Sequence, residues 1–393
     1  MTQIVQSLFL SIRNLNDDQS ELPMILAFRI KRSLQVIIAL GITSLLFLDS
    51  SLAQGSAKLS NSQFFQGIRI HQGSILIHSR ELRPIKNSYP FGIEFDLGWH
   101  KNSTKTWSQC HCAPKIGISL AFWNFDNREV LGMGGSGMFY LQPVFSAERR
   151  LSYAIRSGIG ISYQNMPYDP KENPDNLSYS TKLAFPLQLG VAFNYRLNEQ
   201  WSFDIHALYN HISNGGMKDP NKGINWPSLA VGLTRYLHPV NFSTYERESW
   251  NTSDATCHLT LSVLTTYQEP KDGLYYFSPG IETKIAQQVS RINMVGASVE
   301  YFYDSFRASQ SSDNNGDQMG IGLSHIFILG KFRFNQDFFA YLNDPTNQGA
   351  DFYKRYGLNY GLNSHWKIGI SLKAHGHVAD FIDLRFTRLF MLN

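Results

Sequence analysis

Two side chains that together can hydrolyse an ester, His211 and Ser213, stand two positions apart in this 393-residue chain. On a β-strand, residues two apart point to the same face with alpha carbons roughly 6.5 Å apart, so the side chains can meet. An imidazole can take the proton of a serine hydroxyl, which can then attack an ester carbonyl. Backbone N–H groups around Asn214 to Gly216 can hold the resulting oxyanion, because glycines allow close approach of the backbone.

The pattern before His211 indicates which surface these two side chains occupy. From Trp201 onward the odd positions are mostly apolar, whereas the even positions include Asp204 and His206. His211 and Ser213 continue the odd, apolar row. An imidazole and a hydroxyl on a lipid-facing row are unfavourable unless they serve something there, and a substrate lying in the membrane would explain them. The alternative is that the row has reached the headgroup zone, where His and Ser are ordinary.

Long alternating stretches predict an all-β chain that forms an antiparallel transmembrane β-barrel. Residues 151–164 and 177–197 alternate apolar with small or polar side chains, over lengths well beyond the five or six residues of an ordinary strand. Aromatic residues make up 13% of the chain and charged residues 17%, with 30 Gly. One continuous apolar row opposite a polar row is typical of strands between lipid and a lumen. A soluble periplasmic β-protein is the more distant alternative.

The predicted strands fall into two halves. The ranges are 87–100, 115–124, 137–147, 151–164, 177–197, 200–213 and 227–237, then 257–267, 273–285, 291–303, 318–329, 331–342, 352–363, 365–376 and 380–391. The halves are faintly similar, since Trp201 and Trp366 each begin a strand after a turn that starts with Asn, at Asn198 and Asn363. We expect a site-bearing barrel over 60–237, a linker over 238–256 and a second repeat over 257–393. Two small barrels of about eight strands, or one larger barrel of doubled origin, both fit this pattern.

An export signal precedes the strands. Positive residues after Met24 lead into an apolar core of about fifteen residues, which is short for a membrane span, and then into a small-x-small site ending at Ala53. We interpret 1–53 as leader and signal peptide, with Met24 as the true start. A retained N-terminal anchor is the alternative.

Composition argues against several other classes of function. A net charge of +4 is too weak to indicate nucleic-acid binding, and the sequence shows no nucleotide motif, cofactor or metal requirement. Three cysteines do not make a disulfide framework. Cys110 and Cys112 flank His111, which allows a metal site, but a local disulfide or free thiols fit better because Cys257 is the one further thiol.

The loop after the His-x-Ser pair resembles a known family. His211-x-Ser213-Asn214-x-Gly216 followed by Pro220-Asn221-x-Gly223 is similar to the outer-membrane lipid A 3-O-deacylase (PagL-type) family and its acyloxyacyl-hydrolase-like relatives. The resemblance covers roughly Gly67 to Leu237. It implies an eight-stranded barrel in the outer membrane of a Gram-negative bacterium, with its active site on the outer wall and lipid A or a related glycolipid as substrate. It also implies Ser213 as nucleophile, His211 as general base and an oxyanion hole at Asn214 and Gly216.

One position departs from that family. Its third catalytic member is a Glu, and the matching residue here is Asn225. Asn can orient an imidazole but stabilises the imidazolium less than a carboxylate does. Three outcomes are open: a Ser-His-Asn set works, Asp219 substitutes, or activity is lowered or lost. The last would fit a non-catalytic barrel, a pore or a scaffold.

The second half carries no comparable pair. His375 and His377 fall on the lumen-facing parity of their strand, and no Ser lies two residues beyond either. We therefore expect the second half to be structural, as a degenerate copy of the first.

Overall fold

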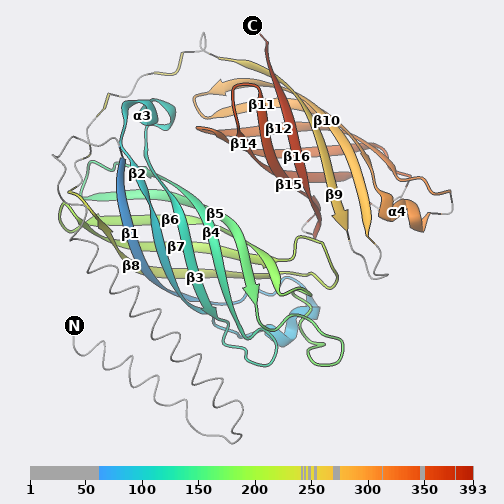
Figure 1. Ribbon diagram of the computed structural model, residues 1–393, viewed down its shortest axis with the longest axis horizontal. Helices are drawn as coiled ribbons and strands as arrows, with labels where there is room; N and C mark the ends of the chain where they lie inside the picture. Colours follow the sequence, from blue (N-terminus) through green and yellow to red (C-terminus); the bar gives the residue numbers. More distant parts are fainter. Residues whose placement is uncertain are drawn as a thin grey trace, which may run out of the picture. The chain divides into compact units, whose positions relative to one another are not determined.

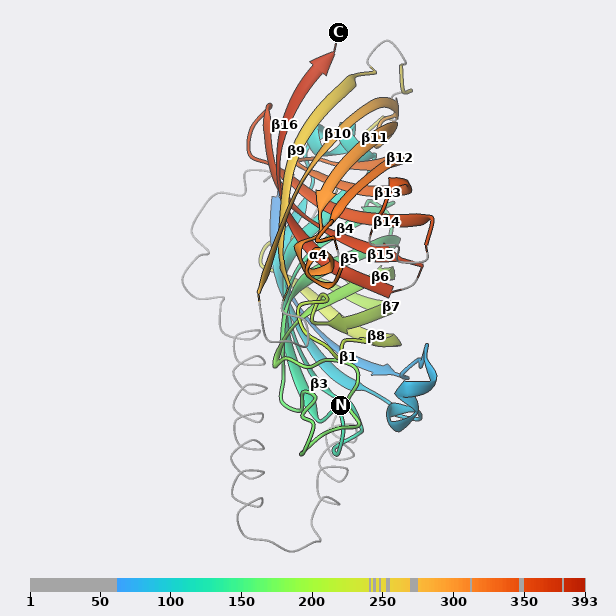
Figure 2. The ribbon, with the colours of Figure 1, turned by 90° about the vertical axis from the view of Figure 1, so that its right-hand side faces the viewer.

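The computed structural model shows two closed barrels of eight antiparallel strands each (Figures 1 and 2). It describes residues 62–392, apart from 240–241, 243–244, 247–248, 252–254, 269–274, 312, 346–349 and 377. The all-β barrel prediction is confirmed, and of its two versions the single larger barrel is wrong. Each set of eight strands closes on itself, through β1 with β8 and β9 with β16. The predicted leader, 1–53, lies outside the described residues.

The strands follow one another around each barrel in chain order. The first barrel contains β1 (Ser62–Gly73), β2 (Phe91–Lys101), β3 (Ala113–Asn124), β4 (Met133–Phe145), β5 (Leu151–Gln164), β6 (Leu183–Arg196), β7 (Trp201–Ser213) and β8 (Ile224–Tyr236). The second contains β9 (Cys257–Gln268), β10 (Tyr276–Ser290), β11 (Asn293–Tyr303), β12 (Asp317–Leu329), β13 (Phe332–Asn343), β14 (Phe352–Gly361), β15 (Trp366–His375) and β16 (Val378–Leu392). Short helical pieces lie in the connections: η1 (Arg80–Ile85), α3 (Thr104–Cys110) and α4 (Ser305–Gln310).

Two strands differ from the sequence-based ranges. β1 was not among them, because its regular alternation is confined to a few residues after Phe65. β6 begins at Leu183, although the alternation starts at residue 177. The chain at 177–178 instead pairs with the β7–β8 loop, where Lys222 N–H donates to Leu177 O (2.9 Å) and Gly223 N–H donates to Ser178 O (2.7 Å). The alternation of residue types over 177–182 therefore does not mark a wall strand, because this segment is a bent loop.

Polar residues fill the lumen of the first barrel. Arg69 and Arg156 bind the carboxylates of Glu94 and Asp96 at distances of 2.6 to 3.0 Å, and all four side chains are buried. The network satisfies each charge with an opposite one, as burial in a low-dielectric interior requires. Such a barrel is packed rather than hollow at its centre.

The second barrel has a separate network of the same kind. Arg355 binds Glu300 (2.7 Å), and Lys284 binds Asp337 (2.8 Å). Apolar side chains of both barrels point outward, as the predicted parity requires; Leu229 and Leu323 are examples, 66% and 72% exposed.

The connections of the first barrel are longer on the whole at one end than at the other. They cover 74–90, 125–132, 165–182 and 214–223 at one end, and 102–112, 146–150 and 197–200 at the other. In outer-membrane barrels the long loops face outward and the short turns face the periplasm. His211 and Ser213 therefore lie at the outward end.

Two of the three cysteines form a disulfide, and the described residues contain neither a cluster of metal ligands nor a membrane-spanning helix. Cys110 and Cys112 form a disulfide, as the preferred interpretation of the sequence expected, and Cys257 is free. Within the described ranges no His, Cys, Asp and Glu side chains gather as metal ligands. Over the same ranges, no helix is both long and apolar enough to cross a membrane.

Candidate active site

The β7–β8 hairpin sets the geometry of the candidate site. Its register places His211 directly opposite Asn225 and Ile212 opposite Ile224. Directly opposed side chains on one face have Cβ atoms about 5 Å apart, close enough for a hydrogen bond between an imidazole and an amide. Ile212 and Ile224 are buried on the inner face. His211 and Asn225 consequently lie together on the outer face.

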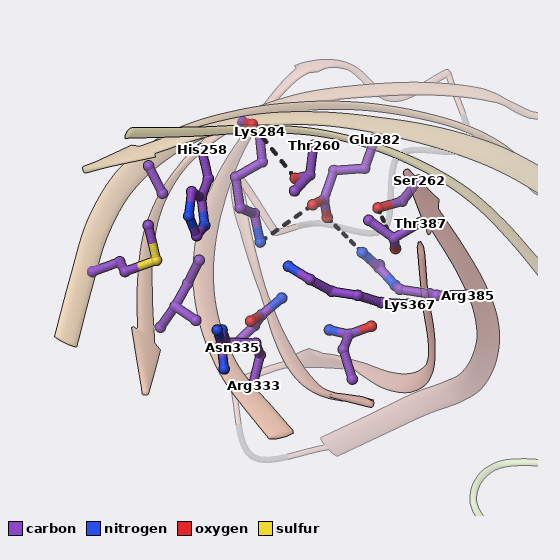
Figure 3. A pocket seen from close by; sticks show the side chains of 14 residues that line it. His258, Thr260, Ser262, Glu282, Lys284, Arg333, Asn335, Lys367, Arg385 and Thr387 are labelled. Carbon is purple, nitrogen blue, oxygen red and sulfur yellow. Dashed lines mark hydrogen bonds and ion pairs between the residues drawn. The ribbon is translucent and has the colours of Figure 1, made fainter. Parts of the chain in front are cut away.

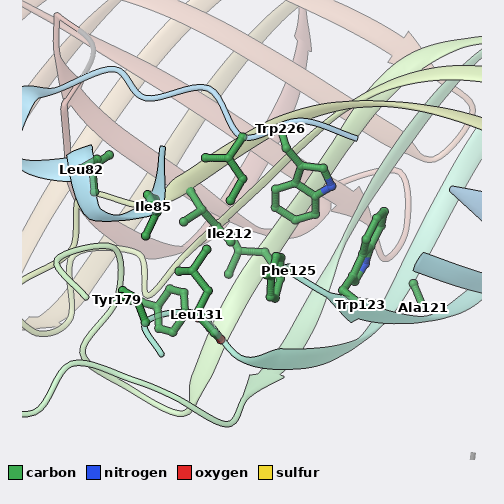
Figure 4. Packing of buried hydrophobic residues seen from close by; sticks show 13 residues of the cluster. Leu82, Ile85, Ala121, Trp123, Phe125, Leu131, Tyr179, Ile212 and Trp226 are labelled. Atoms are coloured by element: carbon green, nitrogen blue, oxygen red, sulfur yellow. The ribbon is translucent and has the colours of Figure 1, made fainter. Parts of the chain in front are cut away.

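An apolar cluster holds this hairpin from inside (Figure 4). Ile212, Ile224 and Trp226 pack in it with residues that reach over from other connections, among them Leu82 of η1 and Tyr179. The Trp226 ring meets the Phe125 ring edge-on at 5.5 Å. Because these side chains are almost fully buried, the cluster closes the outward end of the barrel and gives the hairpin a fixed support.

A chain of three hydrogen bonds defines the protonation of His211. His78 Nε2 lies 2.9 Å from Lys222 O, which can only accept, so this nitrogen carries the proton. The other nitrogen of His78, Nδ1, then accepts from Asn225 Nδ2 at 3.0 Å. That fixes Asn225 Oδ1 toward His211 Nδ1, at 2.6 Å, as acceptor. His211 thus bears its proton on Nδ1, and its Nε2 has a free lone pair, which is the form a general base needs.

The base edge of His211 lies against a glycine. Gly223 has φ +71°, and a Cβ added there would come within 2.7 Å of His211 Cε1 and 3.4 Å of Nε2. Glycine is therefore required at position 223 for two reasons: it adopts the positive φ, and it leaves room beside the imidazole.

Ser213 ends β7 on the same row as His211. It is 8% exposed. Within the described residues, no hydrogen bond joins its Oγ to His211 Nε2. Catalytic hydrogen bonds are often long or poorly aligned before substrate binds, so this geometry is compatible with a nucleophile and its base.

The loop after Ser213 is stiffened by its own side chains. Asn214 N–H donates to Asn221 Oδ1 (2.8 Å), and Gly216 N–H donates to Asn214 Oδ1 (3.1 Å). Asn214 Nδ2 also donates to Lys218 O (2.6 Å). The two amides predicted for the oxyanion thus donate within the loop, whereas Gly215 N–H, between them, makes no hydrogen bond to any described residue.

A surface ion pair links η1 to the same loop. Lys222 Nζ lies 2.8 Å from Glu81 Oε2. The Lys222 ammonium holds the pKa of the Glu81 carboxyl below its ordinary value, chiefly through this hydrogen bond and then through its charge. Since Lys222 O also accepts from His78, η1, the segment at 78 and the β7–β8 loop are tied together beside the site.

Most of the sequence-based site meets in one place. His211, Ser213 and Asn225, with the loop 214–216, lie at one end of the β7–β8 hairpin. The acceptor at His211 Nδ1 is Asn225 rather than Asp219. Sequence reasoning missed His78, which is 147 positions from Asn225. No local signal marks it, because its role depends on a β1–β2 connection that reaches across to β8.

The second barrel presents a histidine in a different setting. His375 Nδ1 lies 2.6 Å from Asp380 Oδ2, and its Nε2 lies 3.0 Å from Tyr341 Oη. Both ring nitrogens are engaged, and its neighbours are aromatic. His377 lies outside the described residues.

Two family models match the chain, one in each barrel. Residues 88–234 match the model described as lipid A 3-O-deacylase (PagL), and residues 255–391 match that described as acyloxyacyl hydrolase, C-terminal domain. The resemblance predicted from the loop motif is therefore confirmed. Each barrel is thus similar to a recognised domain of this group, and the chain is a β-barrel protein of the outer membrane of a Gram-negative bacterium.

Solved structures are similar at low identity. The outer-membrane enzyme PagL is 17% identical, with 42% of this chain and 97% of PagL covered and a TM-score of 0.33. Neisserial surface protein A is 9% identical, with 45% and 99% covered and a TM-score of 0.33. A porin mutant from Rh. blastica is 10% identical, with 84% and 100% covered and a TM-score of 0.21. These scores support no inference about function. Among curated proteins, none matches this chain significantly.

Proposed function

We propose that the first barrel is a serine esterase that removes an ester-linked acyl chain from lipid A or a related glycolipid. The observation that carries the proposal is the Asn225-oriented imidazole of His211, with Nε2 unprotonated, two residues from Ser213 on the lipid-facing row. The match of residues 88–234 to the deacylase family supports this choice of substrate. No metal or cofactor takes part in the proposed chemistry.

The reaction proceeds in two halves. His211 Nε2 takes the proton of Ser213 Oγ as the oxygen bonds to the ester carbonyl carbon, giving a tetrahedral oxyanion. Collapse breaks the bond to the sugar oxygen, which leaves as a hydroxyl with the proton from His211. Water then attacks the acyl-serine with the same base, which releases the fatty acid and restores Ser213.

The loop 214–216 is where we place the oxyanion. Asn214 and Gly216 lie at its two ends, and their hydrogen bonds hold the loop in shape. Gly215 N–H is the amide left available to donate to the developing charge. A fixed donor of this kind stabilises the transition state without reorganising during the reaction.

Asn225 takes the place of the expected acid. Its oxygen orients His211 and selects the tautomer, which a carboxylate would also do, but it carries no charge to stabilise the imidazolium. We therefore propose a Ser-His-Asn set that is functional and less strongly activated than one with Glu.

The wall beside the site suits an acyl chain. Leu187 is paired with His211 across β6–β7, and Tyr209 lies one step further along the same row; the two side chains are 40% and 47% exposed. An acyl chain lying along this row stays in apolar surroundings while its ester reaches Ser213 at the headgroup level.

Mass spectrometry of lipid A tests the proposal. Cells that express the full chain should yield lipid A lacking one acyl chain, and Ser213→Ala should abolish that loss. Ser157→Ala is a matched control, because Ser157 is an outward serine of the same barrel, with its hydroxyl bonded to Leu141 O. An unchanged acyl count with the unmodified protein, on fully acylated lipid A, would refute the esterase.

The rival function is a non-catalytic pore or scaffold. Against a pore, the first barrel is packed with ion pairs at its centre and closed by the apolar cluster at its outward end. Planar-bilayer recordings should accordingly show no steady conductance. Stable channels together with intact lipid A would favour the rival.

A further inference from the structure

The second barrel contains a polar cavity at one end of its lumen (Figure 3). It is a small cavity of about 30 Å³ that opens to solvent. Arg333 and Lys367, near the first residues of β13 and β15, lie beside the tight turns 330–331 and 362–365. Short turns mark the periplasmic end of an outer-membrane barrel, so this cavity opens toward the periplasm.

Two of the cations that line the cavity are neutralised by carboxylates. Lys284 Nζ lies 2.8 Å from Asp337 Oδ1, and Arg385 Nη1 lies 2.5 Å from Glu282 Oε2. They belong to a central network in which three cations bind four carboxylates: Lys284, Arg355 and Arg385 with Glu282, Glu300, Asp337 and Asp383.

The other two cations have no carboxylate partner among the described residues. Arg333 Nη1 donates to the carbonyls of Gly330 (2.7 Å) and Phe332 (3.1 Å), while its Nε is buried without an acceptor. Lys367 makes no hydrogen bond or ion pair to any described residue. The charged groups that act on it, Arg333 and Lys284, have its own sign. The periplasmic mouth therefore carries two half-buried cations, Arg333 and Lys367, that no carboxylate of the described residues contacts.

The remaining lining also has unused polar capacity. Asn335 Oδ1 and Asn359 Oδ1 are buried without a partner, and rotation of either amide would present its NH₂ group instead. Figure 3 shows Lys367 extending across the cavity, with Arg333 and Asn335 at its edge. Buried polar atoms without partners are uncommon, and several around one cavity indicate that something polar occupies it.

We propose that this mouth binds a phosphate-class anion, held between Arg333 and Lys367. A tetrahedral oxyanion offers several acceptors at once, which matches one guanidinium N–H, one ammonium and two amides. Binding removes the repulsion between the two cations and satisfies the orphan donors. The anion is either free phosphate from the periplasm or the phosphate of a lipid headgroup at the barrel rim. This site is independent of the proposed esterase, and it gives the second barrel a role beyond the structural one expected from its sequence.

Thermal unfolding of the full chain in detergent tests the site. Inorganic phosphate should raise Tm relative to chloride at equal ionic strength, because a ligand that binds only the folded state stabilises it. Arg333→Gln combined with Lys367→Gln should remove that rise and weaken phosphate binding at least about tenfold. Lys331→Gln is the matched control, since Lys331 lies exposed in the adjacent turn, with its ammonium 5.7 Å from the Tyr360 ring centroid.

Further arms separate the outcomes. Without phosphate, the double variant should unfold at or above the Tm of the unmodified protein, because it lacks the two cations that repel each other. If the double variant does not fold, the single variant Lys367→Met is used in its place. Stabilisation in vesicles of phosphatidylglycerol, but neither by inorganic phosphate nor in vesicles of a galactolipid, would assign the anion to a headgroup. Equal phosphate shifts in the variant and the unmodified protein would overturn the proposal, as would no stabilisation in either phosphate arm.

Discussion

The two barrels share a topology, and each has its own buried ion network, but their candidate sites lie at different places. In the first, the candidate site is on the outside wall at the outward end, where His211 Nε2 and Gly215 N–H make no hydrogen bond to a described residue. In the second, it is inside the lumen at the periplasmic end, at Arg333 and Lys367. The shared architecture fixes the wall and the centre. The ends are free to differ, because loops and mouths contribute little to closing the sheet.

The periplasmic mouths differ in what lines them. The first barrel also has a cavity at this end, and one of its walls is Phe242, from the segment after β8, whose ring lies 4.5 Å from the His100 ring and 5.3 Å from the Arg196 guanidinium. The cavity of the second is lined entirely by barrel strands. An aromatic side chain from outside the strands thus narrows one mouth, whereas strand residues alone shape the other.

The outward ends of the two barrels hold their histidines in different ways. The apolar cluster under the β7–β8 hairpin makes the first barrel rigid where His211 and Asn225 must hold their register. At His375 in the second barrel, Asp380 and Tyr341 engage both ring nitrogens, so that imidazole has no lone pair to offer a substrate. A site requires a fixed support and an unengaged reactive atom together.

The largest expected effect is a loss of deacylation rate on substitution of His211, with no such loss on substitution of His375. His211→Ala should lower the deacylation rate about 10²–10⁴-fold, which is the usual contribution of a general base. His375→Ala should leave that rate unchanged, although it disturbs packing in the second barrel. Rates of fatty-acid release from purified lipid A measure both. Equal losses from the two variants would show that the barrels do not divide their roles in this way.

Asn225 tests how the base is oriented. Asn225→Ala should reduce kcat roughly 10²-fold, since an imidazole misplaced by about 1 Å costs that much. Asn225→Glu should raise kcat up to about tenfold, because a charged acceptor stabilises the imidazolium formed at the transition state. The carboxylate also favours protonated His211, so the acid limb of the kcat/KM profile should move to higher pH. A lower kcat with the limb unmoved would contradict this role.

Alanine substitutions at two glycines separate the effect of crowding His211 from the effect of backbone strain. Gly223→Ala should reduce kcat about 10-fold or more, because its Cβ would come within 2.7 Å of His211 Cε1. Gly376→Ala in the second barrel has a similar positive φ, +57°, but its Cβ would meet nothing within 4 Å. The second variant should therefore lower Tm slightly and leave kcat intact. Parallel kinetics and thermal unfolding measure the difference.

The smallest effect is expected at His78. His78→Ala removes one hydrogen bond to Asn225, worth about 1 kcal/mol, and should lower kcat roughly fivefold with little change in KM. His78→Gln, which can still accept from Asn225, should restore most of the rate. An increase in KM without loss of kcat would indicate substrate contact in place of positioning.

Sequence patterning predicted much of this molecule. Alternation identified the wall strands and their faces, because the period of two is a local property of an extended chain between lipid and a lumen. The same parity placed His211 and Ser213 outward and Asp204 and His206 inward, and the last two are fully buried. It failed at residues 177–182, which form a bent loop, and at β1, where the alternation is short.

Cross-strand register and long-range contact required the tertiary structure. The register between β7 and β8 decides that Asn225 faces His211. The barrel brings the β1–β2 connection beside β8, and this lets His78 fix the Asn225 amide. The same holds for the closure of two barrels instead of one, and for the meeting of Arg333 and Lys367 in one cavity. The sequence determined which residues face lipid and which face the lumen, because burial preference is local. Only the tertiary structure decided which of them are in contact, because the residues of each contact are far apart in the sequence and are brought together by strand pairing and barrel closure.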